Sequence, residues 1–148
     1  MKRITMFNWI ILLYIVLATL GLLDSSYLTM KHYSAQPLAC GFLNGCDLVT
    51  NSKYSSVFGI PIALIGIFYY SFLALISIIY LTNKNRLLIN TIFILNTITI
   101  FIYGILIYIQ AFILNAFCTY CLISALISIM LFLSGSILFY LEKREKHE

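Results

Sequence analysis

Four cysteines in two pairs are the residues of this chain whose types and spacing best suit chemistry. Cys40 and Cys46 lie in the stretch LACGFLNGCDLV, and Cys118 and Cys121 form a C-x-x-C pair in NAFCTYCLISA. The second pair lies where an apolar run restarts after a polar interruption, at the predicted start of a long helix. Unpaired backbone N–H groups and the helix dipole favour a thiolate at such a place. We therefore interpret the C-x-x-C pair as a redox-active dithiol.

The spacing of the first pair requires the chain to turn back on itself if the two cysteines are joined. Six extended residues would hold the two Cα atoms about 20 Å apart, whereas a disulfide needs them within about 7 Å. The dipeptide Asn44-Gly45 is a strong turn signal, and Gly41 adds backbone freedom. A bridge between Cys40 and Cys46 is therefore sterically reasonable, and an exposed bridge in a small loop is of the labile kind.

The composition indicates that these cysteines belong to a membrane protein. The chain has 148 residues, of which 62% are hydrophobic and 9% charged, and its mean hydropathy is +1.01. A helix needs roughly 20 apolar residues to cross a bilayer, and the sequence offers four such runs. We predict an all-α integral membrane protein, a single bundle of four transmembrane helices whose first span is retained rather than cleaved. The spans are expected at about 6–27, 58–81, 87–109 and 118–141, with an outer redox loop at about 28–57.

Lysine and arginine fall mainly on one side of the predicted spans. Seven of the nine precede the first span, lie between the second and third, or follow the fourth. Because cytoplasmic loops carry the excess of these residues, both termini are predicted to be cytoplasmic and all four cysteines to face the oxidising outer side, where disulfides persist. The formal net charge of +4 then reflects membrane topology, and no basic stripe interleaved with exposed aromatic residues indicates nucleic acid.

Three other interpretations of the cysteine pattern have to be weighed. Two static disulfides can hold a four-helix bundle together in a non-enzymatic membrane scaffold. A structural zinc site is poorly supported, because residues 47–117 separate the two pairs and His32 is the only histidine predicted on that side. A transporter is also poorly supported, because two prolines and few intramembrane polar groups offer little for a midplane binding site.

Four stretches of the sequence together resemble the vitamin K epoxide reductase family, specifically its short bacterial members without a fused thioredoxin-like domain. They are LGLLDSSYLT at the end of the first run, the C-x5-C of the loop, NSKYSSVFGIPIALIG at the second run, and AFCTYCLISA at the start of the fourth. The resemblance extends from about Leu20 to Ala125. It implies a helix bundle around a quinone pocket near the outer surface, capped by a short helical segment of the first outer loop, in the bacterial cytoplasmic (inner) membrane.

The resemblance also implies a role for each cysteine. Cys121 is expected to react with quinone, and Cys118 is its disulfide partner. Cys46 is expected to exchange with Cys118, and Cys40 to meet a thioredoxin-like extracytoplasmic thiol oxidase. The implied activity is that of a quinone-dependent thiol oxidoreductase. It generates disulfides by passing electrons from that partner through both cysteine pairs to menaquinone or ubiquinone.

Three further residues are candidates for contact with the quinone. Ser52 matches a serine that the family places in the capping segment, although capping a short helix is an alternative role for it. Phe117 and Tyr120 flank the dithiol and are candidates for lining the quinone site, with ordinary packing as the alternative. Ala125 stands where the vertebrate enzymes carry a tyrosine, and their substrate-binding asparagine has no clear counterpart here. Plain quinone is therefore the predicted substrate, with reduction of vitamin K or its epoxide as the alternative.

Overall fold

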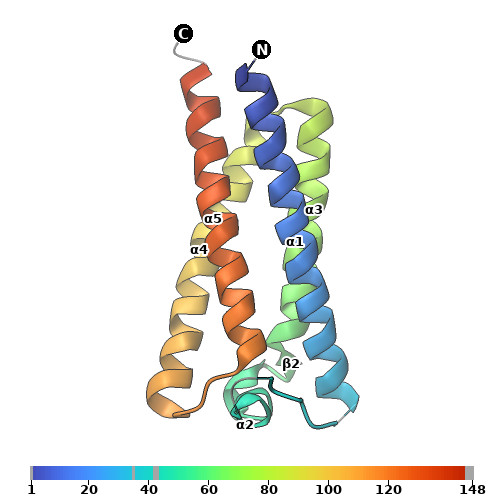
Figure 1. Ribbon diagram of the computed structural model, residues 1–148, viewed down its shortest axis with the longest axis vertical. Helices are drawn as coiled ribbons and strands as arrows, with labels where there is room; N and C mark the ends of the chain where they lie inside the picture. Colours follow the sequence, from blue (N-terminus) through green and yellow to red (C-terminus); the bar gives the residue numbers. More distant parts are fainter. Residues whose placement is uncertain (1, 35, 42–43, 146–148) are drawn as a thin grey trace.

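Four long helices form the body of the protein (Figure 1). The computed structural model describes residues 2–34, 36–41 and 44–145. In this part of the chain the long helices are α1 (Lys2–Ser34), α3 (Ile62–Asn83), α4 (Arg86–Tyr108) and α5 (Thr119–Glu145). All four are long and apolar enough to cross a membrane, which agrees with the predicted all-α transmembrane bundle.

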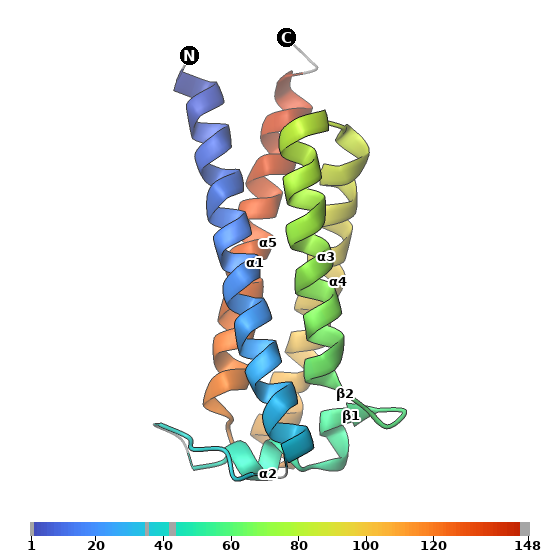
Figure 2. The ribbon, with the colours of Figure 1, turned by 90° about the vertical axis from the view of Figure 1, so that its right-hand side faces the viewer.

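The bundle has two different ends (Figures 1 and 2). Both termini and the short connection between α3 and α4 lie at one end, which we call the terminal end. The opposite end, which we call the loop end, carries the connection from α4 to α5 and the short elements. These short elements are α2 (Cys46–Thr50), the 3₁₀ turn η1 (Lys53–Ser55) and the strands β1 (Ser56–Val57) and β2 (Ile60–Pro61).

The long helices expose apolar side chains on the outside of the bundle. Phe68 of α3 and Phe101 of α4 are each 70% exposed, and Leu133 of α5 is 55% exposed. A helix that is apolar on all sides is suited to a bilayer rather than to water. Because lipid offers no hydrogen-bond partners, segments of this kind are helices whose backbone groups pair internally.

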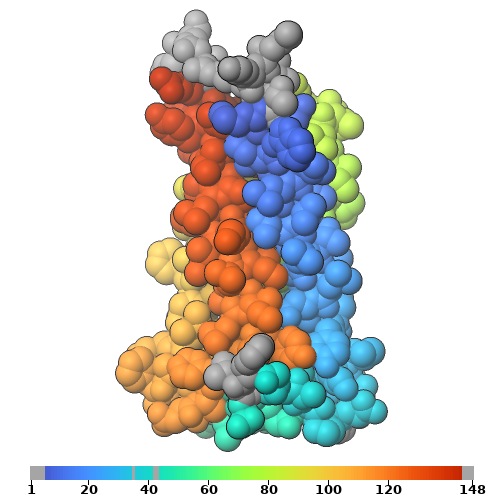
Figure 3. Space-filling model, viewed as in Figure 1, coloured from blue at the N-terminus to red at the C-terminus, as the bar shows by residue number. Residues whose placement is uncertain are grey.

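Small residues allow the helices to approach one another closely. α1 packs against α3 and α5, and Figure 3 shows α1 and α5 side by side along one face. A Cβ atom added at Gly21 of α1 would lie only 2.5 Å from the Tyr70 ring of α3. One added at Gly135 of α5 would lie 2.8 Å from the Asn96 amide nitrogen of α4. Glycine at these positions therefore makes room for a large side chain of the neighbouring helix.

A buried polar network links the helices near the centre of the bundle. The Asn96 amide donates to Tyr14 Oη at 3.0 Å and to the Leu131 carbonyl oxygen at 3.2 Å. Its own oxygen accepts a hydrogen bond from Tyr69 Oη at 2.8 Å. The network thus joins α1, α3, α4 and α5, and Asn96 and Tyr14 are only 1% and 0% exposed. Hydrogen bonds between helices stabilise packing where the hydrophobic effect between helices is absent.

The second long helix begins later than the predicted second span. Residues 58–61 belong to an antiparallel hairpin of β1 and β2, whose central residues Phe58 and Gly59 have positive φ angles of 52° and 81°. Pro61 is the last residue of β2, and α3 begins at Ile62. Proline disfavours helical backbone at the residue before it, so a helix that starts immediately after Pro61 is the expected local outcome.

Two other helix ends matter for the site. α1 continues to Ser34, so the first residues of the predicted outer loop are helical. α4 passes into the π-helical turn η2 (Ile109–Ile113) at the loop end. Turns of this kind are rare and often occur at functional sites. The chain then reverses at Asn115, which has a positive φ angle of 48°, and reaches Cys118 at the start of α5.

Candidate redox site

The fold brings both cysteine pairs together at the loop end. Cys46 and Cys118 belong to one cluster of buried side chains, with exposed fractions of 1% and 0%. Cys40 and Cys121 pack against the same cluster. Residues far apart in the sequence therefore contribute to one side-chain cluster between the redox loop and the start of α5.

The loop pair forms a disulfide. The Cα atoms of Cys40 and Cys46 lie 5.8 Å apart, so the predicted reversal of the loop is confirmed. The backbone N–H of Cys46 also donates to Cys40 Sγ at 3.1 Å. Next to the bridge, a carboxylate oxygen of Asp47 accepts a hydrogen bond from the Leu38 N–H at 2.7 Å. These bonds hold the two sides of the loop together at the beginning of α2.

A glycine permits the loop to touch the chain segment that precedes the C-x-x-C pair. A Cβ atom added at Gly45 would lie 2.8 Å from the Phe117 carbonyl oxygen and 2.9 Å from Ala116 Cβ. Real Cβ atoms essentially never make contacts this short, and two of the three nearest atoms belong to the backbone of Phe117. The contact therefore joins the residues immediately before Cys46 and Cys118, which brings the two pairs side by side.

The C-x-x-C cysteines are free thiols placed at the start of α5. Cys118 immediately precedes the helix and is buried, whereas Cys121 lies in its first turn and is half-buried. The Cys121 N–H donates to Cys118 Sγ at 3.4 Å. A hydrogen bond from the Cys121 side chain lowers the pKa of the Cys118 thiol to about 7, against the opposing effect of burial. A thiol with a pKa near ambient pH is well suited to disulfide exchange.

Gln110, in the π turn η2, is bonded to the backbone of the C-x-x-C segment. Its side-chain oxygen accepts a hydrogen bond from the Cys118 N–H at 3.0 Å, and its backbone oxygen accepts one from the Ala116 N–H at 3.1 Å. Gln110 is only 4% exposed. Sequence reasoning missed this residue. The available signal was a polar side chain near the end of an apolar run, which is a functional flag when such a group lies inside a bundle.

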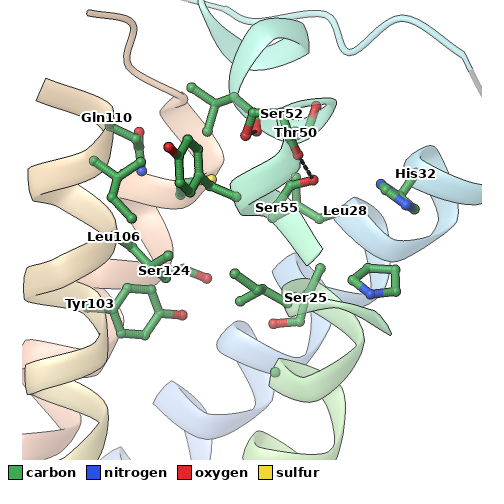
Figure 4. Close-up of a pocket in the computed structure, with 18 of the residues that line it drawn as sticks. Ser25, Leu28, His32, Thr50, Ser52, Ser55, Tyr103, Leu106, Gln110 and Ser124 are labelled. Atoms are coloured by element: carbon green, nitrogen blue, oxygen red, sulfur yellow. Dashed lines mark hydrogen bonds between the residues drawn. The ribbon is translucent and has the colours of Figure 1, made fainter. Parts of the chain in front are cut away.

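A cavity of about 110 Å³ lies beside these residues at the loop end. One water molecule needs about 10–15 Å³ on the same measure, so the space suits a much larger group. Cys121, Ser52, Gln110 and Tyr103 are among its lining residues, and His32 lines it as well. Figure 4 shows Gln110 and Tyr103 on one side of the cavity and His32 on the opposite side. The inner cysteine of the C-x-x-C pair therefore faces a cavity that is lined by the long helices and by the short elements of the loop end.

The three predicted quinone contacts fall in different places. Ser52 lines the cavity, and it occupies the N-cap position of η1 without a side-chain capping bond, because its hydroxyl donates to the Val49 carbonyl oxygen at 2.8 Å. Phe117 and Tyr120 are not among the residues that line the cavity in the described part of the chain. Tyr120 packs on the ring of Tyr27 with centroids 5.1 Å apart, and Phe117 is 39% exposed.

A carboxylate of α1 reaches the helix that carries the dithiol. Asp24 accepts a hydrogen bond from Ser124 Oγ at 2.6 Å, and Ser124 lies three residues after Cys121. The negative charge of Asp24 raises the pKa of Cys118, in opposition to the stronger effect of the bond from Cys121. The charge of α1 therefore adjusts the reactivity of the thiol at the start of α5.

A bundle of four apolar helices with a bridged cysteine pair packed against a C-x-x-C dithiol is the architecture of a membrane oxidoreductase that works through disulfides. The chain matches the model of the vitamin K epoxide reductase family over residues 12–135. The protein therefore belongs to this family, as its motifs indicated. Members of the family are linked to quinone and to a redox partner, and the matched region contains all four cysteines and the cavity.

Proposed function

We propose that this protein generates disulfides by passing electrons from an extracytoplasmic thioredoxin-like partner through its two cysteine pairs to quinone. The observation that carries the proposal is the burial of Cys46 and Cys118 in one cluster, with Cys121 facing the cavity. A relay by sulfur exchange needs an outer pair accessible to a protein, an inner pair next to the acceptor, and contact between them. The half-buried Cys40, the cavity beside Cys121 and the shared cluster of Cys46 and Cys118 support the proposal.

The outer half of the relay starts with the partner's dithiol. One partner thiolate attacks the disulfide between Cys40 and Cys46, and the second closes a disulfide within the partner, which leaves both loop cysteines as thiols. Cys46 then attacks Cys118 of the oxidised C-x-x-C pair, so that a Cys46–Cys118 bond forms and Cys121 leaves as a thiolate. Cys40 attacks Cys46 in turn, the loop bridge re-forms, and Cys118 is released as a thiol.

The inner half of the relay ends at the cavity. With the loop pair bridged and the C-x-x-C pair reduced, both electrons reside on Cys118 and Cys121, which is the pairing in the present structure. The dithiol becomes a disulfide as two electrons and two protons pass to a quinone bound beside Cys121. The quinone supplies the redox capacity that side chains lack, and Ser52, Tyr103 and Gln110 are among the polar side chains that line the cavity.

We also propose that the loop end faces the extracytoplasmic side of a bacterial cytoplasmic membrane. The C-cap of α3, the first residue of α4 and the last turn of α5 carry basic side chains, and these helix ends lie at the terminal end. A cytoplasmic location of that end satisfies the positive-inside rule. It also leaves the four cysteines where an oxidising partner operates.

Replacing Cys46 tests the relay against a scaffold with static bridges. The variant Cys46→Ala retains the dithiol and the cavity, so it is expected to reduce a soluble quinone with a small dithiol as donor but to lose turnover with a reduced thioredoxin-like protein. Purified wild-type protein provides the reference. Equal loss with both donors would contradict the shuttle. A C-x-x-C redox state that stays unchanged in cells without quinone synthesis, assayed by thiol alkylation, would favour the scaffold.

A further inference from the structure

The hydrogen bond between Gln110 and Cys118 fixes the orientation of the glutamine amide. A backbone N–H can only donate, so the amide atom 3.0 Å from the Cys118 nitrogen is the oxygen Oε1. The amide nitrogen Nε2 therefore points away from the Cys118 N–H. It makes no hydrogen bond within residues 2–34, 36–41 and 44–145. Gln110 thus offers an unused donor.

This donor belongs to a side chain that is 96% buried and that lines the cavity beside Cys121. Figure 4 shows the side chain extending from the side of α4 toward the cavity. Polar groups of buried side chains nearly always have a hydrogen-bond partner. A ligand with a hydrogen-bond acceptor in the cavity would supply the missing partner.

Most lining hydroxyl groups are already engaged as donors. Ser52 donates to the Val49 carbonyl oxygen at 2.8 Å, and Thr50 donates to the Cys46 carbonyl oxygen at 2.8 Å. Each hydroxyl carries one proton, so neither can donate to a ligand without giving up its present bond. The amide of Gln110 has two N–H groups and needs no such rearrangement.

Three other polar side chains that line the cavity, those of Ser25, His32 and Tyr54, make no hydrogen bond within the described residues. Gln110 differs from these three residues because its side-chain oxygen accepts a hydrogen bond from the Cys118 N–H. The Nε2 donor therefore has a defined position relative to Cys118. The π turn that carries it is also a local departure from regular helix of a kind that often accompanies function.

We infer that Gln110 is a quinone-binding residue whose Nε2 donates to the quinone carbonyl nearest Cys121, while its Oε1 holds the Cys118 backbone. This inference rests on the proposed function. When the two thiols become a disulfide, two electrons and two protons move to the quinone, whose two carbonyl groups become hydroxyl groups. Negative charge develops on the carbonyl oxygen during this transfer, and a preorganised donor stabilises it. One side chain thus aligns the acceptor with the dithiol.

The test compares Gln110→Met with the matched control Gln36→Met. Gln36, the other glutamine of the chain, is exposed, bonds to Lys31 Nζ at 3.2 Å and is absent from the residues lining this cavity. The first readout is the infrared carbonyl stretch of a short-chain benzoquinone bound to the oxidised protein. A donated hydrogen bond lowers this frequency in the wild type and in Gln36→Met. Gln110→Met is expected to lose the lowering.

The second readout separates a role toward quinone from a purely structural one. The dithiol of each variant is oxidised either by the short-chain benzoquinone or by diamide, which does not need the cavity. Gln110→Met is expected to slow the benzoquinone reaction on the order of tenfold to a hundredfold, as for a lost transition-state donor, and to leave the diamide reaction unchanged. Equal slowing with both oxidants, or an unchanged carbonyl stretch, would overturn the inference.

A failure of the proposed function gives a different result, because the wild-type protein itself would then leave the benzoquinone unreduced. If Gln110→Met does not fold, Gln110→Glu is compared with Gln36→Met in the same two measurements. Above the pKa of its carboxyl group it still accepts from the Cys118 N–H, but it has no donor for the cavity. A loss of the carbonyl shift in this variant supports the inference, and retention of the shift overturns it.

Discussion

The four cysteines differ in their surroundings, and these differences agree with the direction of the proposed relay. Cys40 is half-buried at the edge of the cluster, Cys46 and Cys118 are enclosed within it, and Cys121 lines the cavity. A partner protein can therefore approach the outermost sulfur, whereas the innermost one is reached from the cavity. The two enclosed cysteines are protected from unrelated thiols, and their exchange with one another is favoured by proximity.

Removing the charge of Asp24 tests how the site adjusts thiol reactivity. The carboxylate raises the pKa of Cys118, so Asp24→Asn is expected to move that pKa below its present value of about 7. More thiolate is then present at slightly acidic pH. Ultraviolet absorbance of the thiolate, followed against pH in protein with a bridged loop, measures the midpoint. Asp47→Asn, a change in the loop carboxylate, is the control, and an equal shift in both variants would contradict a specific effect of Asp24.

At the scale of secondary structure, one glycine governs how the redox loop docks on the start of α5. Gly45→Ala puts a Cβ within about 3 Å of the Phe117 backbone. Overpacking of this kind typically destabilises a contact by about 1–3 kcal/mol, so exchange between the two pairs is expected to slow roughly tenfold. Oxidation of the dithiol by quinone is expected to remain unchanged. Stopped-flow measurement of the two half-reactions checks this.

Gly41→Ala provides the matched control for that experiment. Gly41 lies in the same loop, and a Cβ added there meets nothing within 4 Å. Its substitution is expected to leave both half-reactions at the wild-type rate. If Gly41→Ala slowed the exchange as much as Gly45→Ala, general loop flexibility and not the contact with Phe117 would be responsible.

The interhelical network centred on Asn96 is expected to contribute to the stability of the bundle. Asn96→Leu removes its bonds to Tyr14, Tyr69 and the Leu131 carbonyl oxygen. We expect the free energy of unfolding in mixed micelles to fall by roughly 1–2 kcal/mol, the size of interhelical hydrogen bonds in membranes. Asn90→Leu, at an exposed position of the same helix, is the control. An equal loss in both variants would show that the network adds nothing.

The elements and the cysteines were predictable to different degrees. Apolar run length predicted four helices, and cysteine spacing predicted both pairs, because these signals are local in the sequence. The hairpin ending at Pro61 was missed, since an apolar composition conceals a turn set by the positive φ angles of Phe58 and Gly59. The role of Gln110 was also missed, because its bond to Cys118 depends on how α4 and α5 pack. Tertiary contacts of this kind leave no periodic pattern.

At the scale of the whole molecule, the two ends of the bundle carry different groups of residues. The terminal end carries basic helix ends and no cysteine, whereas the loop end carries the four cysteines and the cavity. Four helices that are long and apolar enough to cross a membrane carry this site at one end of the bundle. The proposed relay requires that a partner in water and an acceptor dissolved in lipid both reach this end.

The most direct test of the account is to trap the bond between Cys46 and Cys118. The double variant Cys40→Ser, Cys121→Ser leaves only these two cysteines. Because both are buried in one cluster, mild oxidation in the membrane is predicted to join them in nearly all molecules, as mass spectrometry of linked peptides would show. If the two thiols stay free, or pair only between different molecules, electrons do not cross from the loop to the dithiol by this route and the relay is wrong.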